Sequence, residues 1–337
     1  MRLFHASSRL AMLCIAVAIA AGCSMTPSAS PLQNSVARTN SRPAQSDADA
    51  GAVHIKTPAL LFDDSTTGAL EYWPIVRGGS SNPTRISQPG IFHGLGMVAN
   101  GRVVSFANDS PNEVVTFDVR NQHENTLPDP YGTPFDIAIG KDASLYVIND
   151  YNGRTNVAIY PGGAPRPREL SCRFVSFSQQ IAVDNEGDIF LNGIESTNSI
   201  GVVEIPNGPN GPEPQKCKEL NGLQPETANA GIAVDPKTDA LIVLSNPDEC
   251  AGGEEGRMTI YPKPYRARTA IVHDIGENCS WGLRLSGDSK LVFVHDEDVS
   301  GSHIFVLQRS YPDGRRFGTY HGPHPSSFTT IPNTLPN

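Results

Sequence analysis

Charge is scarce in this sequence, and long apolar runs are absent. Charged residues make up 18% of the 337 residues, which is too few for a coiled coil or a charge-rich disordered chain. The 35 acidic residues outnumber the 26 basic ones, for a formal net charge of −9, and this balance argues against a nucleic-acid binder, which needs a basic face. No apolar stretch reaches the roughly 18 residues of a membrane-spanning helix. With 31 Gly and 28 Pro, the chain has little room for long helices.

Standard catalytic and metal-binding motifs are also absent. The sequence contains no Gly-x-Ser-x-Gly elbow, no His-Glu-x-x-His, no phosphate-binding loop, no Cys-x-x-Cys and no dinucleotide fingerprint. The acidic stretch 296–301 has Leu307 where a calcium loop would place its bidentate Glu. We therefore expect no cofactor and no bound metal.

The first 22 residues have the layout of a secretory signal. Arg2 and Arg9 precede an uncharged apolar run, Leu10–Ala21, which ends in small residues. The following Ala20-Ala21-Gly22-Cys23 resembles the lipobox of bacterial lipoproteins, although Ala20 stands where that family usually has Leu. The resemblance implies cleavage before Cys23, acylation of its thiol (palmitate among the chains) and membrane attachment through an N-terminal lipid. Because Ser24 rather than Asp follows the cysteine, it further implies an outer-membrane lipoprotein facing the periplasm or the cell surface. Cleavage nearby to give a soluble periplasmic protein is the alternative.

Residues 23–57 form a second region, rich in Ser, Ala, Thr, Asn, Gln and Pro. Such a composition cannot bury enough apolar surface to offset its ordering entropy. We expect a flexible tether that begins at the lipidated cysteine and carries a domain over 58–337.

A repeat occupies the region 58–337. Its most regular copies contain a small–Ile–Ala–Val run, followed by a turn, a second apolar run, a polar loop and a third alternating run. The first apolar residues of successive copies are Leu95, Ile137, Ile181, Ile232 and Leu283. Short strands in groups of four at intervals of roughly 40–50 residues are typical of β-propeller blades.

The sequence thus predicts an all-β fold, a propeller of four-stranded antiparallel blades. Five full copies and one partial copy, Leu60–Asp63 with Ala69–Trp73, give six blades; seven blades is the alternative. The partial copy lacks its innermost strand. A segment near Phe328–Ile331, or one just before Leu60, would complete it and close the ring.

The repeat resembles NHL-type and gluconolactonase-type six-bladed propellers. The resemblance rests on the Ile-Ala-Val-Asp runs, on the strand Leu145–Asp150 that ends in Asn-Asp, and on third strands that end in Tyr-Pro. The gluconolactonase type holds a divalent metal on its axis with a Glu, Asn and Asp set, which this sequence does not reproduce.

The innermost strands supply the candidate site residues. Alternate positions of these strands should face the central channel, and most of them hold small residues. Asp136, Gln180 and Arg284 are the exceptions, and His93 and Trp281 lie near one mouth of the channel. Arg284 opposite Asp136 would either grip a polar ligand or pair with that carboxylate and fill the channel.

We expect a lipid-anchored envelope propeller that acts as a non-catalytic binding or scaffolding module for a protein or a small polar ligand. The alternative is a lactonase- or lyase-like enzyme with its site at the mouth of the channel. An open channel in which Asp136, Gln180 and His93 converge would favour this alternative. A third class is a surface structural protein that uses its outer loops, such as Pro206–Pro214 and Pro247–Arg257.

Four cysteines follow Cys14 and Cys23, and an even number in an exported domain suggests disulfides. Cys250 and Cys279 should lie in loops on one face of the propeller, which favours their pairing. Cys172 with Cys217 then follows by exclusion.

Overall fold

The computed structural model describes residues 55–64, 66–80, 82–87, 94–109, 111–195, 200–220, 223, 231–245, 256–275, 280–297, 304–322 and 325–331. The predicted signal segment, Cys23 and nearly all of the predicted tether lie outside these residues. So do His93, Cys250 and Cys279.

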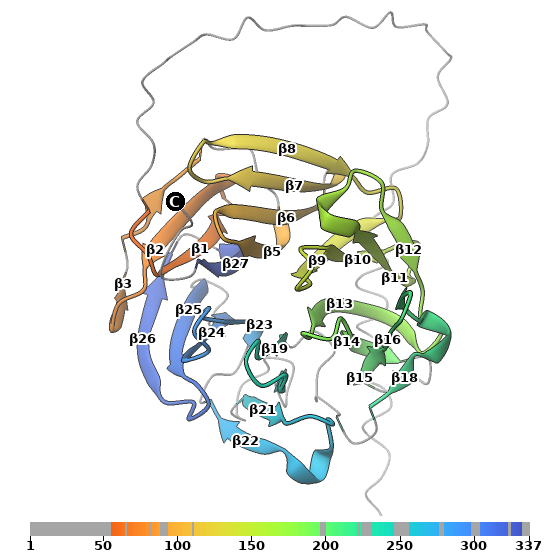
Figure 1. Ribbon diagram of the computed structural model, residues 1–337. Coiled ribbons are helices and arrows are strands. Elements are labelled where there is room, and N and C mark those ends of the chain that lie inside the picture. Colours follow the sequence, from red (N-terminus) through yellow and green to blue (C-terminus); the bar gives the residue numbers. More distant parts are fainter. Residues whose placement is uncertain are drawn as a thin grey trace, which may run out of the picture. The chain divides into compact units, whose positions relative to one another are not determined.

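The described chain folds into six four-stranded antiparallel sheets arranged around a central axis, a six-bladed β-propeller (Figure 1). The strands of each blade are given from the innermost outward. Blade I consists of β27 (Pro325–Ile331), β1 (Ala59–Asp64), β2 (Ala69–Pro74) and β4 (Thr84–Arg85), and blade II of β5 (Gly94–Asn100), β6 (Val103–Asp109), β7 (Asn112–Asp118) and β8 (His123–Pro128). Blade III consists of β9 (Thr133–Ile139), β10 (Leu145–Asp150), β11 (Thr155–Tyr160) and β12 (Arg168–Leu170).

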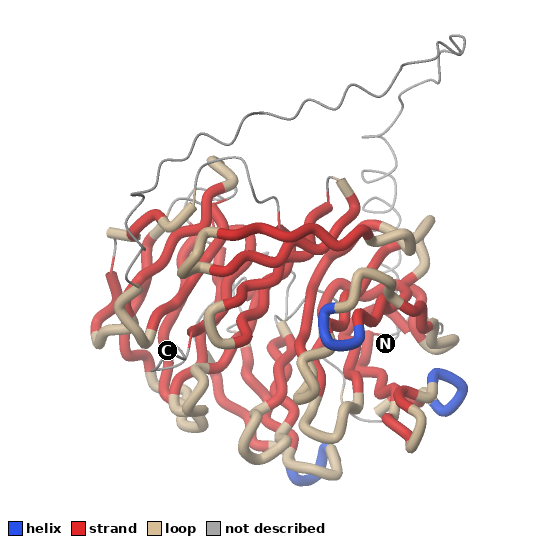
Figure 2. Tube along the Cα trace, turned by 45° about the horizontal axis from the view of Figure 1, so that its top comes forward, coloured by secondary structure: helices blue, strands red, loops and turns tan. Residues whose placement is uncertain are grey.

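The remaining three blades follow the same order. Blade IV is β13 (Val175–Val183), β14 (Ile189–Glu195), β15 (Ile200–Ile205) and β18 (Lys218–Glu219), blade V is β19 (Ile232–Val234), β20 (Leu241–Ser245), β21 (Arg257–Tyr261) and β22 (Ile271–Asp274), and blade VI is β23 (Ser280–Leu285), β24 (Leu291–Glu297), β25 (Ile304–Ser310) and β26 (Arg316–His321). The described helices are single 3₁₀ turns on the periphery, η1 (Pro161–Gly163), η2 (Pro214–Lys216) and η3 (Ala267–Thr269) (Figure 2).

The hydrophobic core lies between blades. Each strand alternates its side chains between two faces, and each face packs on the neighbouring blade. In blade III, for example, Tyr146 and Ile148 pack with Ile181 of blade IV, whereas Leu145 and Val147 pack with Ala107 of blade II. The apolar runs of the repeat therefore read as strands that are buried on both faces.

The C-terminal strand closes the ring. β27 is the innermost strand of blade I and pairs with β1, with Phe62 opposite Phe328. This confirms the prediction that a segment near Phe328–Ile331 supplies the missing strand. The seam between blades VI and I is rich in aromatic rings: Phe62 stacks on Trp73 at 3.8 Å between ring centroids, and Phe293, Tyr320 and Phe328 complete the cluster.

A second link across the same seam was not expected from the sequence. β3 (Gly78–Ser80) leaves blade I and pairs in parallel with the outer strand β26 of blade VI. Tyr320 on β26 also bonds the backbone of Val76 through its hydroxyl. The N-terminal blade is thus tied to the C-terminal blade both near the axis and at the rim.

Replacing Phe328 by Ala tests this closure. The substitution leaves a cavity in the aromatic seam, and we expect it to lower the free energy of unfolding by about 3–5 kcal/mol. Urea denaturation provides the measurement, with Val272→Ala on the exposed face of β22 as a control that should change stability by about 0.5 kcal/mol or less. Equal effects of the two substitutions would contradict the role of β27.

Candidate functional site

The innermost strands approach one another closely at the hub of the propeller. A Cβ atom added to Gly96 on β5 would lie 2.4 Å from the Cα atom of Asp136 on β9. Only glycine leaves space for that approach. The small residues of the repeat therefore serve packing between blades, and they bring the Asp136 carboxylate into the middle of the hub.

An ion pair between Asp136 and Arg284 crosses this hub. Arg284 on β23 donates from Nη2 to Oδ1 of Asp136 at 2.7 Å. The other guanidinium nitrogens donate to backbone carbonyls, Nε to Met97 at 3.3 Å and Nη1 to Leu283 at 2.9 Å. The second Asp136 oxygen accepts the N–H of Ile181 on β13 at 3.2 Å. One pair of side chains thus joins the innermost strands of blades II, III, IV and VI.

Burial and bonding limit the chemistry of this pair. Asp136 is 2% exposed, and the Arg284 side chain is 18% exposed. Burial raises the pKa of the Asp136 carboxyl, while Arg284 and the backbone N–H groups of Ile137 and Ile181 oppose that rise. A carboxylate whose two oxygens already accept these bonds is poorly placed to act as a general base or to coordinate a metal.

The structure brings some of the predicted site residues together and leaves others undecided. Gln180 lies on β13 directly before Ile181, whose N–H bonds Asp136. Its side chain is half-buried and has no hydrogen-bonding partner within the described residues. Trp281 belongs to β23, but its side chain is outside what the structure describes, as is His93 altogether.

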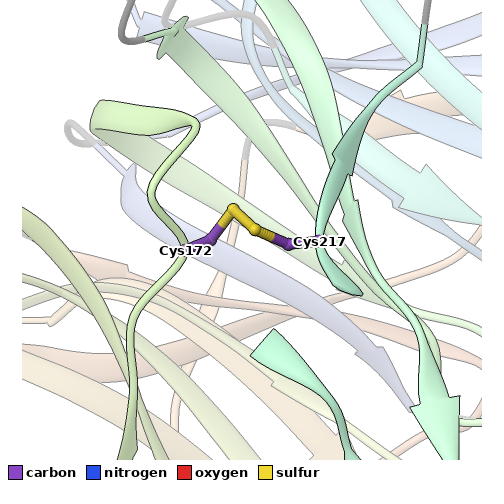
Figure 3. Close-up of a disulfide and its surroundings, with 2 residues drawn as sticks. All are labelled: Cys172 and Cys217. Atoms are coloured by element: carbon purple, nitrogen blue, oxygen red, sulfur yellow. A yellow bond between two sulfur atoms is a disulfide. The ribbon is translucent and has the colours of Figure 1, made fainter. Parts of the chain in front are cut away.

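Cys172 and Cys217 form a disulfide, with Cα atoms 6.0 Å apart (Figure 3). Cys172 follows β12 of blade III, and Cys217 precedes β18 of blade IV. The long connection between β15 and β18 brings Cys217 back to the vicinity of Cys172. The predicted Cys250–Cys279 pair falls on residues outside the description.

Polar residues at the ends of the second strands have two different roles. Asp64 and Asp150 cap their own turns, accepting backbone N–H bonds from Thr66 and Gly153, as expected for Asx residues. Asn149 instead is buried and donates from Nδ2 to Asp129 and to Asn156. Asn149 therefore links β10 to β11 and to the residue that follows β8, rather than capping a turn.

His295 occupies a comparable position on β24, opposite Gly282. Its ring lies edge-on to Phe328, with centroids 6.1 Å apart. Nε2 has no access to solvent and no partner in the described part of the chain. Burial lowers the pKa of His295 to about 4, so the imidazole is neutral at neutral pH.

One acidic cluster outside the hub has metal-like spacing. Asp184, Glu186 and Asp188, in and after the turn that follows β13, have carboxylate oxygens within 4.8 Å of one another. Lys263 of blade V binds both Asp184 and Glu186 at 3.0 Å, and the Tyr265 hydroxyl donates to Asp184. The cluster is thus part of the contact between blades IV and V.

None of the helices among residues 55–331 that the structure describes is long and apolar enough to cross a membrane.

No protein-family model matches the sequence, and no curated protein matches it. Solved structures do match. A chain in the crystal structure of a nidogen/laminin complex has 16% identity and a TM-score of 0.60, over 82% of this chain and 99% of that chain. TolB from Acinetobacter baumannii has 12% identity and a TM-score of 0.58, over 84% and 69%.

A putative gluconolactonase has 14% identity and a TM-score of 0.48, over 67% of this chain and 77% of that chain. At such identities these likenesses concern the fold alone, and propellers serve many unrelated functions.

Protonation of His295 should make stability pH-dependent. The unfolded chain binds this proton near pH 6.5, whereas the folded chain binds it only near pH 4. The free energy of unfolding should therefore fall as the pH drops from 6.5 toward 4. Urea denaturation of His295→Leu at several pH values should show a shallower fall than the wild type. His123→Gln, at an exposed position, serves as the control; a slope unchanged in His295→Leu would refute the assignment.

Proposed function

We propose that this protein is a lipid-anchored propeller of the cell envelope that acts as a non-catalytic binding or scaffolding module. The non-catalytic part of this proposal rests on the Asp136–Arg284 ion pair. The polar atoms of the two side chains are bonded to each other and to backbone groups of Met97, Ile181 and Leu283. The hub thereby serves stability, and ligand recognition is left to the faces of the propeller.

A lactonase- or lyase-like enzyme is the alternative from the sequence. Such an enzyme needs polar groups that converge on an open pocket. At the hub, Asp136 is buried and bonded to Arg284, which argues against catalysis at this position.

The partner-binding face that we propose is the one where innermost strands begin and second strands end. The strand register places Gly94 opposite Asn108, and Thr133 opposite Asp150, on this face. Two large apolar side chains remain exposed beside these positions, Leu95 at 40% and Tyr151 at 56%. Exposed aromatic and aliphatic side chains of this kind are typical anchors in protein interfaces.

The lipid anchor is supported by the lipobox-like Ala20-Ala21-Gly22-Cys23 and by the apolar segment before it. Several acyl chains would hold the protein stably, whereas one chain gives only weak attachment. The tether over 23–57 would then separate the propeller from the bilayer by roughly 30 Å.

Replacing Cys23 by Ser should abolish lipidation. When cells that express the variant are grown with radiolabelled palmitate, the variant should remain unlabelled. It should also be recovered in the soluble fraction rather than the membrane fraction. Cys14→Ser is the matched control, because Cys14 lies inside the predicted signal segment and should not affect labelling. Palmitate labelling that persists in Cys23→Ser, or a wild type that is never labelled, would contradict the anchor.

Partner binding is tested with the double variant Leu95→Asp/Tyr151→Asp. Desolvating two carboxylates in an apolar contact is costly, so capture of protein partners from an envelope extract should fall about tenfold or more. The control is Ile271→Asp on the outer strand of blade V, at a side chain of similar exposure (47%), which should capture the same proteins as the wild type. Equal capture by both variants would refute the proposed face.

The same wild-type sample should be incubated with lactone substrates and divalent cations. We expect no turnover above the buffer rate. Metal-dependent turnover that is lost in Asp136→Asn would contradict the non-catalytic assignment.

A further inference from the structure

A cleft of about 510 Å³ lies between blades III and IV, on the side of the propeller where innermost strands end. Its volume is within the roughly 300–1,000 Å³ range of small-molecule sites. Blade III contributes the turn Gly140–Ser144, Tyr146 on β10 and Arg168 on β12. Blade IV contributes the turn Asn185–Gly187 and the hairpin of β16 (Asn207–Gly208) and β17 (Gly211–Pro212).

The wall of the cleft on blade IV is held in place by hydrogen bonds. Asn207 at the start of the hairpin donates its N–H to Asp188 and its side-chain amide to the carbonyl of Glu186, each at 2.6 Å. Asn185 donates its side-chain amide to Asp239 and to the carbonyl of Pro236, each at 2.7 Å. The amides of this wall are therefore already bonded, and they shape the cleft without being free to bind a ligand.

The disulfide fixes the two walls to each other. Cys172 lies two residues after β12, the strand that carries Arg168, and Cys217 ends the connection that contains the hairpin. Gly211 of the hairpin lies directly against Arg168, since a Cβ atom there would be 2.7 Å from the guanidinium Nη2. The φ of +101° at Gly211 favours glycine at this position.

Three polar groups of blade III at this cleft have no bonding partner among the residues that the structure describes. Tyr146 is 5% exposed, and its hydroxyl has no hydrogen-bonding partner in the described part of the chain. Lys141 and Arg168 form no ion pair with any described residue. Burial and the Asp142 carboxylate raise the pKa of Tyr146, with Arg168 opposing the rise, so the hydroxyl keeps its proton and can donate.

The acidic groups of the cleft are already engaged. Asp142 accepts the backbone N–H and the hydroxyl of Ser144, and Glu186 pairs with Lys263 at 3.0 Å. Within the described part of the chain, Lys141 and Arg168 have no ion-pair partner, so two cations and one phenolic donor are available to an incoming molecule. Arginine suits planar or tetrahedral oxyanions because its guanidinium donates two parallel hydrogen bonds.

We propose that this cleft binds a small polar molecule, of about the size of a monosaccharide, that carries a carboxylate or phosphate group. Arg168 forms the principal contact with the oxyanion, Lys141 adds charge at the rim, and the Tyr146 hydroxyl donates a hydrogen bond from the floor. The site is separate from the proposed partner face, so its success or failure does not bear on that proposal.

Isothermal titration calorimetry of the full chain tests the proposal. Glucuronate probes the carboxylate source, glucose 6-phosphate probes the phosphate source, and glucose is the neutral control. We expect saturable binding of at least one of the two anions and none of glucose. The anion that binds more tightly identifies the source.

The variant Arg168→Gln should weaken this binding about 10- to 100-fold, because a charge-assisted hydrogen-bonding pair is lost. Tyr146→Phe keeps the ring and should weaken binding by a smaller factor. Arg120→Gln, at an exposed arginine in the turn after β7, is the matched control and should bind as the wild type does. Absence of saturable anion binding, or equal affinity in Arg168→Gln and Arg120→Gln, would overturn the proposal.

Discussion

The contact on which the centre of this propeller depends is the ion pair between Asp136 and Arg284. Six innermost strands converge on the axis, and glycine at positions such as Gly96 lets their backbones come within van der Waals distance. A convergence this tight leaves a buried carboxylate that must be compensated, since an unpaired buried charge is very costly. Arg284 provides that compensation from the far side of the ring, and its remaining donors bind carbonyls of its own strand and of β5.

Closure of the ring follows from the same requirement that both faces of every sheet be buried. The first sheet along the chain lacks an innermost strand, and β27 from the C-terminus supplies it. The aromatic cluster around Trp73 is concentrated at this one seam. The parallel pairing of β3 with β26 adds a second connection between the same two blades. The ends of the propeller domain are therefore joined by both apolar packing and backbone hydrogen bonds.

The architecture could be predicted because it repeats. The period of the Ile-Ala-Val runs defined the blades, and the partial copy at Leu60–Trp73 implied a strand donated from elsewhere. Features that occur once could not be predicted in this way. The β3–β26 pairing and the β16–β17 hairpin depend on tertiary contacts of short segments, such as those of Asn207 with Asp188, which carry no periodic signal.

The candidate site shows the same division. Alternation along the innermost strands was enough to single out Asp136 and Arg284, but not to decide between a bound ligand and a mutual pair; that depends on the distance across the hub. The cleft beside Arg168 escaped prediction because its residues come from separate turns and strands of two blades. The loop Pro206–Pro214 was named only as an outer loop of a surface structural protein. Its place against blade III became apparent from the disulfide and from the contact of Gly211 with Arg168.

We propose that function in this protein lies on surfaces around a hub that is occupied by its own side chains. The measurement that tests this account most directly is a double-mutant cycle of Asp136→Asn and Arg284→Gln, with unfolding free energies from urea denaturation. If the pair holds the hub together, the two single variants should each be destabilised, and the double variant should be more stable than their sum predicts by about 1.5 kcal/mol or more. Additive effects within about 0.5 kcal/mol would show that the two side chains act independently, and the closed hub would have to be abandoned.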